Sequence, residues 1–418
     1  MTSNDILDLN NLMYLPDTNA SVAVARTQRT FYPEKSSYRE RERISITIDG
    51  NQFLDFKNSS LRFLFKPLNG TVSKFGDFAS ATNFFSRVRV VSKDGIVFTD
   101  LLRANLFSHL ESLLKDSKLY REVVGLSYGY NSSFTSTLNP TYEYTIPMRM
   151  LSPLFNCSQL LPPQLSDGMT IEFFLEDPTV AFDLLSEPGV FITVYEINNV
   201  ELLVDASLVQ DNTRNEVENM GFGGSDDLVY EFTDVVNSQS FAPLGSDDIY
   251  FEAPHSLSNA LEAITVLRKQ DNVLSPNFSS MDTVGPFSNP SSLNTDYKNQ
   301  DLMSYSLGSN KFPEQPVLGA ARIYQQILYS QGVLQSRTCN QFNVELLGTH
   351  IRYGMYPVNL RTSKLFDNSG RTVSNAQRLS VSLRRYEIDE ASKNYILDMF
   401  IYYTARIVVK NGKMSIEI

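Results

Sequence analysis

Residues 60–114 constrain the fold of this chain more than any other part of its sequence. They contain three short apolar runs of strand length, followed by a single helical pattern. In order, these cover residues 61–65, 85–91, 96–98 and 101–115. Parallel sheets need a long crossover, usually a helix, between consecutive strands, and no helical pattern separates these three runs. The stretch therefore predicts an antiparallel β fold that carries one inserted helix.

The predicted helix has one apolar stripe. Five leucines recur along it at helical spacing, namely Leu102, Leu106, Leu110, Leu113 and Leu114. Asp100 stands directly before the first turn, where its carboxylate could accept hydrogen bonds from unpaired N–H groups. We predict that Asp100 caps the helix and that the stripe seals one flank of a β domain. The polar face, with Arg103 and Glu111, would then be available to a neighbouring subunit.

The residue types extend the β prediction to the whole chain. Of the 418 residues, 42% are hydrophobic, which is enough to build real cores and excludes global disorder. The 27 Phe and 21 Tyr favour strands, and glycine and proline are spread throughout as turn residues. A length of 418 residues indicates two or three domains.

Charge and cysteine usage exclude several classes of protein. A net charge of -11 argues against a nucleic-acid-binding chain, which needs a concentrated basic surface. Cys157 and Cys339 lie too far apart in sequence for a metal knuckle, so we expect free buried thiols in a reducing compartment. The chain begins without a signal-peptide pattern, and no window is apolar enough to span a membrane. We expect a protein that is not secreted and leaves its cell only by lysis.

The first part of the chain is expected to be an N-terminal arm over residues 1–40. It is polar and then basic, and Arg26, Arg29 and Arg39 are candidate contacts to a neighbouring subunit, together with Arg103 of the helix. A frayed, solvated terminus explains the same residues equally well.

Three further parts follow from composition. Residues 41–208 contain about eight strand signals, which is the range of a β-sandwich. Residues 209–227 are rich in Asn, Asp and Gly and indicate a linker. Residues 228–418 restart the strand pattern as a second β domain.

The second domain repeats the organisation of the first. Its opening strands are followed by an irregular insertion over residues 271–316 and a predicted helix over residues 318–331. Both halves end in a long alternating run, over residues 190–204 and 395–409. This similarity of plan without similarity of residues predicts an internal duplication.

No residue pattern points to catalysis or to a metal site. His109, His255 and His350 lie outside ligand spacing of one another, and a nucleophile elbow and a P-loop are absent. The glycine-rich run at residues 221–224 is followed by acidic residues that would repel phosphate. We expect no catalytic residue, no metal and no cofactor, although a pair of carboxylates brought together by folding stays open.

Several segments resemble one known protein family. They are residues 75–79, 85–91, 94–95, 103–107, 111–114, 146–148, 154–155, 160–162 and 168–173 in the first half, and residues 342–346 and 356–358 in the second. Together they are similar to the double jelly-roll major capsid proteins of tailless icosahedral double-stranded DNA viruses, of the polinton-like virus and virophage type. The resemblance covers most of residues 40–418 in the order of their elements.

The resemblance implies an all-β fold of two tandem eight-stranded jelly rolls, each with an inserted helix and long loops. It implies a structural protein and not an enzyme, of which three copies form a pseudo-hexagonal capsomer and capsomers tile an icosahedral virion shell. The implied partners are copies of the chain itself, penton proteins and minor capsid proteins, with no sequence-specific nucleic acid. The N-terminal arm would face an inner layer, including an inner membrane where a virion has one.

Two other classes of protein remain open. A viral spike or a carbohydrate- or receptor-binding β-sandwich protein would also use exposed tyrosines and an oligomer, but it would not need a flat pseudo-sixfold trimer. A hydrolase built on a β-sandwich would require acidic residues to meet in one cleft.

Overall fold

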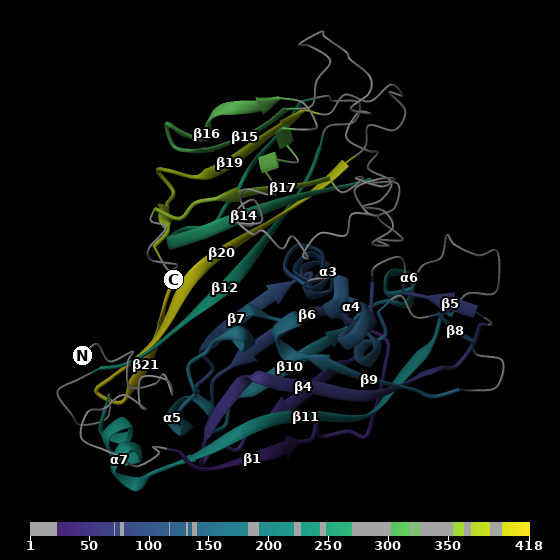
Figure 1. The fold of residues 1–418 in the computed structure, drawn as a ribbon, viewed down its shortest axis with the longest axis vertical. Coiled ribbons are helices and arrows are strands. Elements are labelled where there is room, and N and C mark those ends of the chain that lie inside the picture. The colour runs from purple at the N-terminus through teal and green to yellow at the C-terminus, as the bar shows by residue number, and fades with distance from the viewer. Residues whose placement is uncertain are drawn as a thin grey trace.

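The computed structural model describes residues 23–70, 72–75, 79–116, 118–130, 133–135, 140–182, 192–220, 227–242, 248–269, 302–318, 322–323, 325–326, 354–362, 369–384 and 395–418. Antiparallel sheets make up two blocks, which lie one above the other in Figure 1. Among the described helices, none has the length and apolar character that crossing a membrane requires.

The lower block in Figure 1 contains the first half of the chain. Eight of its strands form two sheets, ordered β1-β11-β4-β9 (the β4 sheet) and β3-β10-β6-β7 (the β6 sheet). Counted along the chain, the two orders read 1-8-3-6 and 2-7-4-5, which is the strand arrangement of a jelly roll. The eight strands are β1 (Ala23–Phe31), β3 (Arg43–Thr47), β4 (Phe53–Pro67), β6 (Phe85–Val91), β7 (Val97–Leu102), β9 (Tyr142–Pro147), β10 (Thr170–Leu175) and β11 (Tyr195–Val209).

The upper block repeats this topology. Its sheets are ordered β12-β20-β14-β17 (the β14 sheet) and β13-β19-β15-β16 (the β15 sheet), which again read 1-8-3-6 and 2-7-4-5. The eight strands are β12 (Leu228–Phe241), β13 (Asp248–Glu252), β14 (Leu257–Lys269), β15 (Leu302–Leu307), β16 (Asn310–Leu318), β17 (Gly354–Asn359), β19 (Leu379–Arg384) and β20 (Tyr395–Lys410). The predicted double jelly roll and the predicted duplication are therefore confirmed.

Shorter elements complete the two blocks. β2 (Ser37–Arg39) joins β11, β18 (Arg371–Val373) joins β14, β21 (Lys413–Glu417) joins β20, and β5 (Val72–Lys74) pairs with β8 (Ser133–Thr135). The helices are α3 (Ala104–Lys115), α4 (Lys118–Val123), α5 (Pro163–Ser166), α6 (Pro178–Ala181) and α7 (Asp211–Asn219). The 3-10 turns are η1 (Ala81–Phe84), η2 (Val124–Tyr128), η3 (Met148–Met150) and η4 (Pro153–Asn156).

The β4 and β6 sheets enclose an aromatic core. Phe63 and Phe65 of β4 point inward and are fully buried. The ring of Phe63 lies 5.8 Å from that of Phe85, and the ring of Phe65 lies 4.9 Å from that of Phe84. Such tilted and edge-on aromatic pairs stabilise a core beyond the area they bury. Several of the phenylalanines of the chain therefore lie in the core between these two sheets.

The expected arm is wrong in its second half. β1 pairs with β11 from Ala23 to Phe31, and β2 pairs with β11 from Ser37 to Arg39. These strands belong to the β4 sheet, and β1 is the first strand of the jelly roll. Their sequence carries no apolar alternation because much of β1 is exposed. Its partner in β11 is distant in sequence, so no local pattern revealed the pairing.

Two other expected loops contain regular structure. Within the expected linker, α7 is helical over Asp211–Asn219, and Val209 still belongs to β11. Within the expected insertion, β15 and β16 occupy most of the last part. Neither strand has the residues typical of a strand. In β15, serines occupy one face, and β16 contains prolines, which are acceptable because it is the edge of its sheet. The helix predicted over residues 318–331 lies mostly outside the described residues.

The predicted cap of α3 is also wrong. β7 continues to Leu102, Arg103 adopts the left-handed conformation with φ 57°, and the helix begins at Ala104. Asp100 stays in the strand, where Arg87 Nε donates to its Oδ1 over 2.6 Å. Leu102 is 48% exposed and does not belong to the stripe, whereas Leu106, Leu110 and Leu114 are buried as predicted.

Candidate functional site between the two jelly rolls

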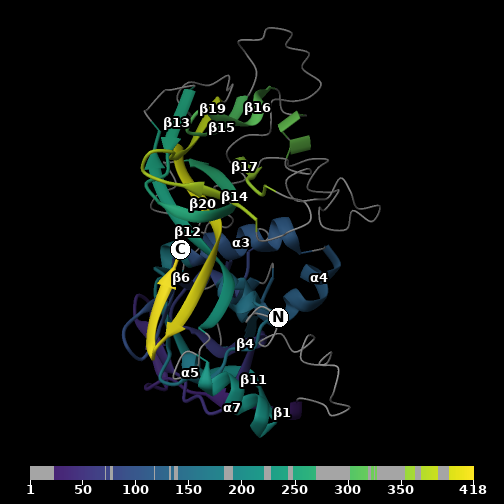
Figure 2. The same ribbon diagram turned by 90° about the vertical axis from the view of Figure 1, so that its left-hand side faces the viewer.

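The ribbon formed by β12 and β20 reaches from the second jelly roll onto the first (Figures 1 and 2). β14 accompanies β20 only as far as Tyr403, but β12 pairs with β20 as far as Val409. Beyond the end of β14, Tyr230 and Ile407 lie against Phe98 and Phe155 of the first jelly roll, around a gap of only about 10 Å³. All four side chains are buried. Burial of apolar area is the main favourable term in such contacts, so this packing joins the two blocks.

The backbone of β12 is hydrogen-bonded to the loop after η4. The Cys157 thiol donates to the carbonyl oxygen of Glu231 over 3.4 Å, and the Glu231 N–H donates to the side-chain oxygen of Gln159 over 3.3 Å. The Tyr230 hydroxyl donates to the Gln159 carbonyl oxygen over 3.3 Å. A strand at the edge of a sheet otherwise presents unpaired backbone groups. The first jelly roll satisfies some of those groups on β12.

Cys157 is a free thiol, as predicted, and Cys339 lies outside the described residues. Burial raises the pKa of the Cys157 thiol, so it stays protonated at neutral pH. A protonated thiol is neither a good nucleophile nor a metal ligand. Its role here is packing and the hydrogen bond to β12.

Asp234 of β12 bonds to the first jelly roll through one carboxylate oxygen and to its own sheet through the other. Thr99 of β7 donates to Oδ1 over 2.6 Å, and the Tyr403 hydroxyl of β20 donates to Oδ2 over 2.9 Å. The Asp234 side chain is buried, with 3% of the residue exposed. Burial raises the pKa of Asp234 to about 6, although the hydrogen bonds from Thr99 and Tyr403 act in the opposite direction. A buried carboxylate shared in this way fixes the position of β12 relative to β7.

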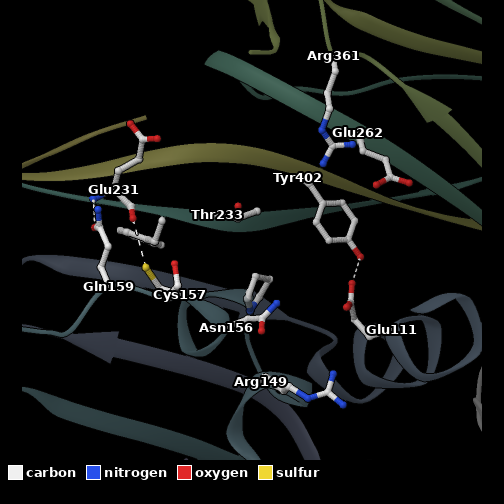
Figure 3. A pocket seen from close by; sticks show the side chains of 13 residues that line it. Glu111, Arg149, Asn156, Cys157, Gln159, Glu231, Thr233, Glu262, Arg361 and Tyr402 are labelled. Atoms are coloured by element: carbon white, nitrogen blue, oxygen red, sulfur yellow. Dashed lines mark hydrogen bonds between the residues drawn. The ribbon is translucent and has the colours of Figure 1, made fainter. Parts of the chain in front are cut away.

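Helix α3 separates the two blocks and contacts both. Its apolar stripe packs against β6 and η1 of the first jelly roll. On the other side, the Phe107 ring lies 6.3 Å from that of Phe400 and 6.1 Å from that of Tyr402, both on β20. The Tyr402 hydroxyl donates to Glu111 Oε1 over 2.5 Å (Figure 3). Glu111 therefore faces the second jelly roll of its own chain, which corrects the expectation that it is available to another subunit.

A cavity of about 540 Å³ lies beside these contacts and is walled by both jelly rolls (Figure 3). Its charged walls come from Glu111, Arg149, Glu231, Glu262 and Arg361. Arg149 Nη2 lies 3.1 Å from Asp116 Oδ1, and the Arg406 Nε lies 2.8 Å from Glu231 Oε2. Within the described part of the chain, no three His, Cys, Asp or Glu residues are grouped so that they could hold a metal ion. Two of the charged residues in the wall, Arg149 and Glu231, are thus held in ion pairs with residues outside the cavity.

The four predicted contact residues do not gather in one place. Arg29 pairs with Asp49 over 3.0 Å within the first jelly roll, which occupies its guanidinium. Arg103 is half-buried at the start of α3, where its charge counteracts the rise in pKa that burial causes in Glu176. Arg26 in β1 and Arg39 in β2 are exposed. That these residues contact another subunit stays a prediction.

Sequence reasoning missed Asp234, Tyr402 and Gln159 as residues that join the two blocks. One signal was present: Asp234 is an acidic residue within a long strand of otherwise mostly apolar and neutral residues. A carboxylate at such a position is expected to be buried with hydrogen-bond partners. The partners themselves come from β7 and β20, and no local pattern shows that these strands meet.

No protein-family model matches this sequence, and no curated protein matches it. Solved structures do match in fold. Against the PBCV-1 protein VP54, fitted into a reconstruction of the virophage Sputnik, the TM-score is 0.64 at 10% identity, covering 96% of this chain and 99% of that chain. Against a chain of the Sputnik virophage structure the TM-score is 0.59 at 10% identity, covering 96% and 90% of the two chains.

The Faustovirus major capsid protein gives a TM-score of 0.58 at 8% identity, with 95% of this chain and 92% of that chain covered. Coverage of nearly the whole length of both chains means that both jelly rolls, and their order, are shared. The sequence resemblance predicted the same type of protein. The chain has the double jelly-roll fold of viral major capsid proteins.

Proposed function

We propose that this chain is the major capsid protein of a tailless icosahedral virus. In this proposal three copies form a pseudo-hexagonal capsomer, and capsomers tile the shell of the virion. The observation that carries the proposal is the pair of jelly rolls with one topology, held by a shared buried interface. Two similar blocks per chain give six similar blocks per trimer, and six blocks can fill a near-hexagonal outline.

The interface supports a structural role. Phe107, Tyr230, Phe400 and Asp234 are buried between the blocks, where they hold one block against the other. Domain interfaces within a chain are often mobile unless they are large and hydrophobic. A building block of a shell needs an interface that does not move. This chain has an apolar contact between its two blocks, reinforced by buried hydrogen bonds.

The partners in this proposal are other copies of the chain, with penton and minor capsid proteins at special positions of the shell. The location is the virion, after synthesis inside the host cell. The net charge of -11 disfavours direct condensation of the genome, because like charges repel. Any contact with an inner membrane would be made through the segment before β1.

The test is the size and outline of the purified chain. We expect a particle of three times the chain mass by light scattering, and negative-stain images with a threefold, nearly hexagonal outline. Monomers, or elongated trimers without that outline, would contradict the proposal. Elongated trimers would favour the viral spike or the carbohydrate- or receptor-binding protein instead.

A further inference from the structure

The last strand, β21, has one backbone edge that no neighbouring strand covers. It pairs with β20 over Arg406–Lys410, beyond Tyr403, where the pairing of β14 with β20 ends. No strand of the described chain pairs with the other side of β21. The strand lies at the margin of the molecule in Figure 1. A free edge of this kind is a template for pairing with another strand.

The register of the hairpin determines which backbone groups point to this free edge. The hairpin between β20 and β21 is closed by a two-residue turn at Asn411–Gly412. The residues that flank such a turn exchange both backbone hydrogen bonds, and bonded and non-bonded pairs then alternate along the strands. Lys413 and Ser415 accordingly bond to β20. The N–H and C=O groups of Met414 and Ile416 point away from β20, to the free edge.

Other edges of the two blocks are protected in ways that β21 is not. β16 carries Pro313 and Pro316, which lack the N–H that pairing with another strand requires. β12 and β7 lie against each other within the chain. β21 contains no proline, and its two apolar side chains, Met414 and Ile416, pack on the core but are only partly buried. A strand added at this edge would bury them further.

The sequence of β21 is complementary to itself in the antiparallel direction. When two copies pair with Ser415 opposite Ser415, Lys413 of one copy lies opposite Glu417 of the other, and Met414 lies opposite Ile416. Opposite charges and apolar side chains directly across an antiparallel pair both stabilise it. Lys413 and Glu417 are exposed, and neither has an ion-pair partner among the residues that the structure describes. The same register brings the outward N–H and C=O groups of Met414 and Ile416 together, so backbone and side chains favour one pairing.

We propose that two copies of this chain associate through β21, which pairs with β21 of the second copy in antiparallel orientation about a twofold axis at Ser415. Each copy contributes the same surface, as a twofold contact requires. The β14 sheets of the two copies then form one continuous sheet. In a closed shell of trimers, this contact would join one trimer to the next. Only that last step rests on the proposed function, because the pairing itself needs two copies and no shell.

Charge reversal in the full-length chain tests the register, with sedimentation velocity over a range of concentrations as the measurement. We expect Lys413→Glu and Glu417→Lys each to raise the concentration for half-association through the twofold contact by about tenfold. Each variant places two pairs of like charges across the axis. The double variant restores opposite charges and should return to within about threefold of the wild type. The matched control is Lys311→Glu, at an exposed cation on β16, which should change nothing. A double variant as weak as the single ones would contradict this register.

A cysteine on the axis provides a second measurement that does not depend on affinity. Ser415→Cys places one thiol from each copy across the axis, in a non-hydrogen-bonded pair whose Cα atoms are about 4.5 Å apart, which a disulfide can span. Mild oxidation should then give covalent dimers of the chain. Lys413→Cys is the control, because its two thiols would lie about 13 Å apart along the strands, and it should give no more dimer than the wild type. Equal dimer yields from the two variants would contradict the pairing.

Failure of this contact and failure of the proposed function are distinguishable. Trimers that form, but that neither respond to charge reversal nor give covalent dimers with Ser415→Cys, would overturn the β21 contact and leave the proposed function standing. Covalent dimers from Ser415→Cys in a chain that forms no trimers would support the β21 contact and overturn the proposed capsomer.

Discussion

The two jelly rolls share one strand order, but the outer faces of their equivalent sheets differ. On the outer face of the β4 sheet, Arg62 lies 2.6 Å from Glu143 and 2.9 Å from Glu201, and all three side chains are partly exposed. On the outer face of the β14 sheet, Phe400 and Tyr402 are buried against α3. One sheet faces solvent through charges, and the other is buried on both faces.

The difference shows that the residue types on the outer face of a sheet depend on what packs against that face. They do not depend on the strand order, which the two jelly rolls share. A sheet with one solvated face reads as alternating apolar and polar residues, and a sheet covered on both faces reads as a nearly continuous apolar run. β4 follows the first pattern from Leu61 to Phe65, and β14 follows the second from Ala260 to Leu267. Helix α3 contributes to this difference, because Phe107 packs against Phe400 and Tyr402 on the outer face of the β14 sheet.

The largest expected effect comes from one charge placed on each outer face. Phe400→Asp puts an unpaired carboxylate into a buried site, which costs about 5 kcal/mol and should abolish soluble folded protein. Leu203→Asp makes the same change on the partly exposed outer face of β11 and should lower stability by less than about 1 kcal/mol. Soluble yield and urea unfolding measure both. Equal losses from the two variants would remove the distinction between the faces.

A medium effect is expected from pH, through Asp234. Because the folded pKa of about 6 lies above the usual aspartate pKa of about 3.9, the folded state binds the proton more tightly than the unfolded state. The free-energy cost of burying the ionised carboxylate is thus absent below about pH 4. It grows as the pH rises and is complete above about pH 6, where it lowers the free energy of unfolding by about 3 kcal/mol. Asp234→Asn removes the ionisable group and can keep both hydrogen bonds, provided that the amide N–H donates to the oxygen of one of the two hydroxyls.

Urea unfolding at several pH values checks this prediction. The wild type should lose stability relative to Asp234→Asn as the pH rises from about 4 to about 6. Asp248→Asn is the control, since the Asp248 side chain is 70% exposed and lies 2.6 Å from Arg384 at the surface. If the wild type and Asp234→Asn lost or gained stability in parallel as the pH changes, the prediction would be wrong. Burial would then not favour the protonated form of Asp234.

The smallest effect is expected from the exposed charges of the β4 sheet. Arg62→Gln removes both ion pairs, but exposed pairs are screened by water and salt and contribute little. We expect a small fall in the unfolding midpoint at low salt that disappears at high salt. A large, salt-independent loss would mean that this face is covered, as the β14 sheet is.

Much of the fold could be predicted from local patterns. The apolar stripe of α3, the alternating runs of β3 and β20, and the turn at Asn411 and Gly412, with φ of 51° and 71°, all follow from residue spacing or from turn chemistry. β1 could not be predicted, because its residues are exposed and its partner β11 is distant in sequence. β16 was missed because prolines interrupt it, although prolines are acceptable at a sheet edge.

The candidate site was less predictable than the fold. The contacts that join the two blocks connect residues from opposite halves of the chain, such as Thr99 with Asp234 and Glu111 with Tyr402. The sequence shows that Glu111 lies on the polar face of a helix. It does not show that the second jelly roll of the same chain covers that face. The spacing of apolar residues predicts which side chains are buried. It does not predict which part of the chain covers them, because that depends on the tertiary structure.

The two jelly rolls of this chain form one cooperative unit, because they share a buried interface. Hydrogen exchange during a urea titration tests it most directly, when peptides from β11 and from β20 are followed in the same samples. We expect both peptides to lose protection at the same urea concentration, because unfolding of either block exposes the interface of the other. Loss of protection in β20 at clearly lower urea, with β11 still protected, would contradict the claim and show two independently folding domains.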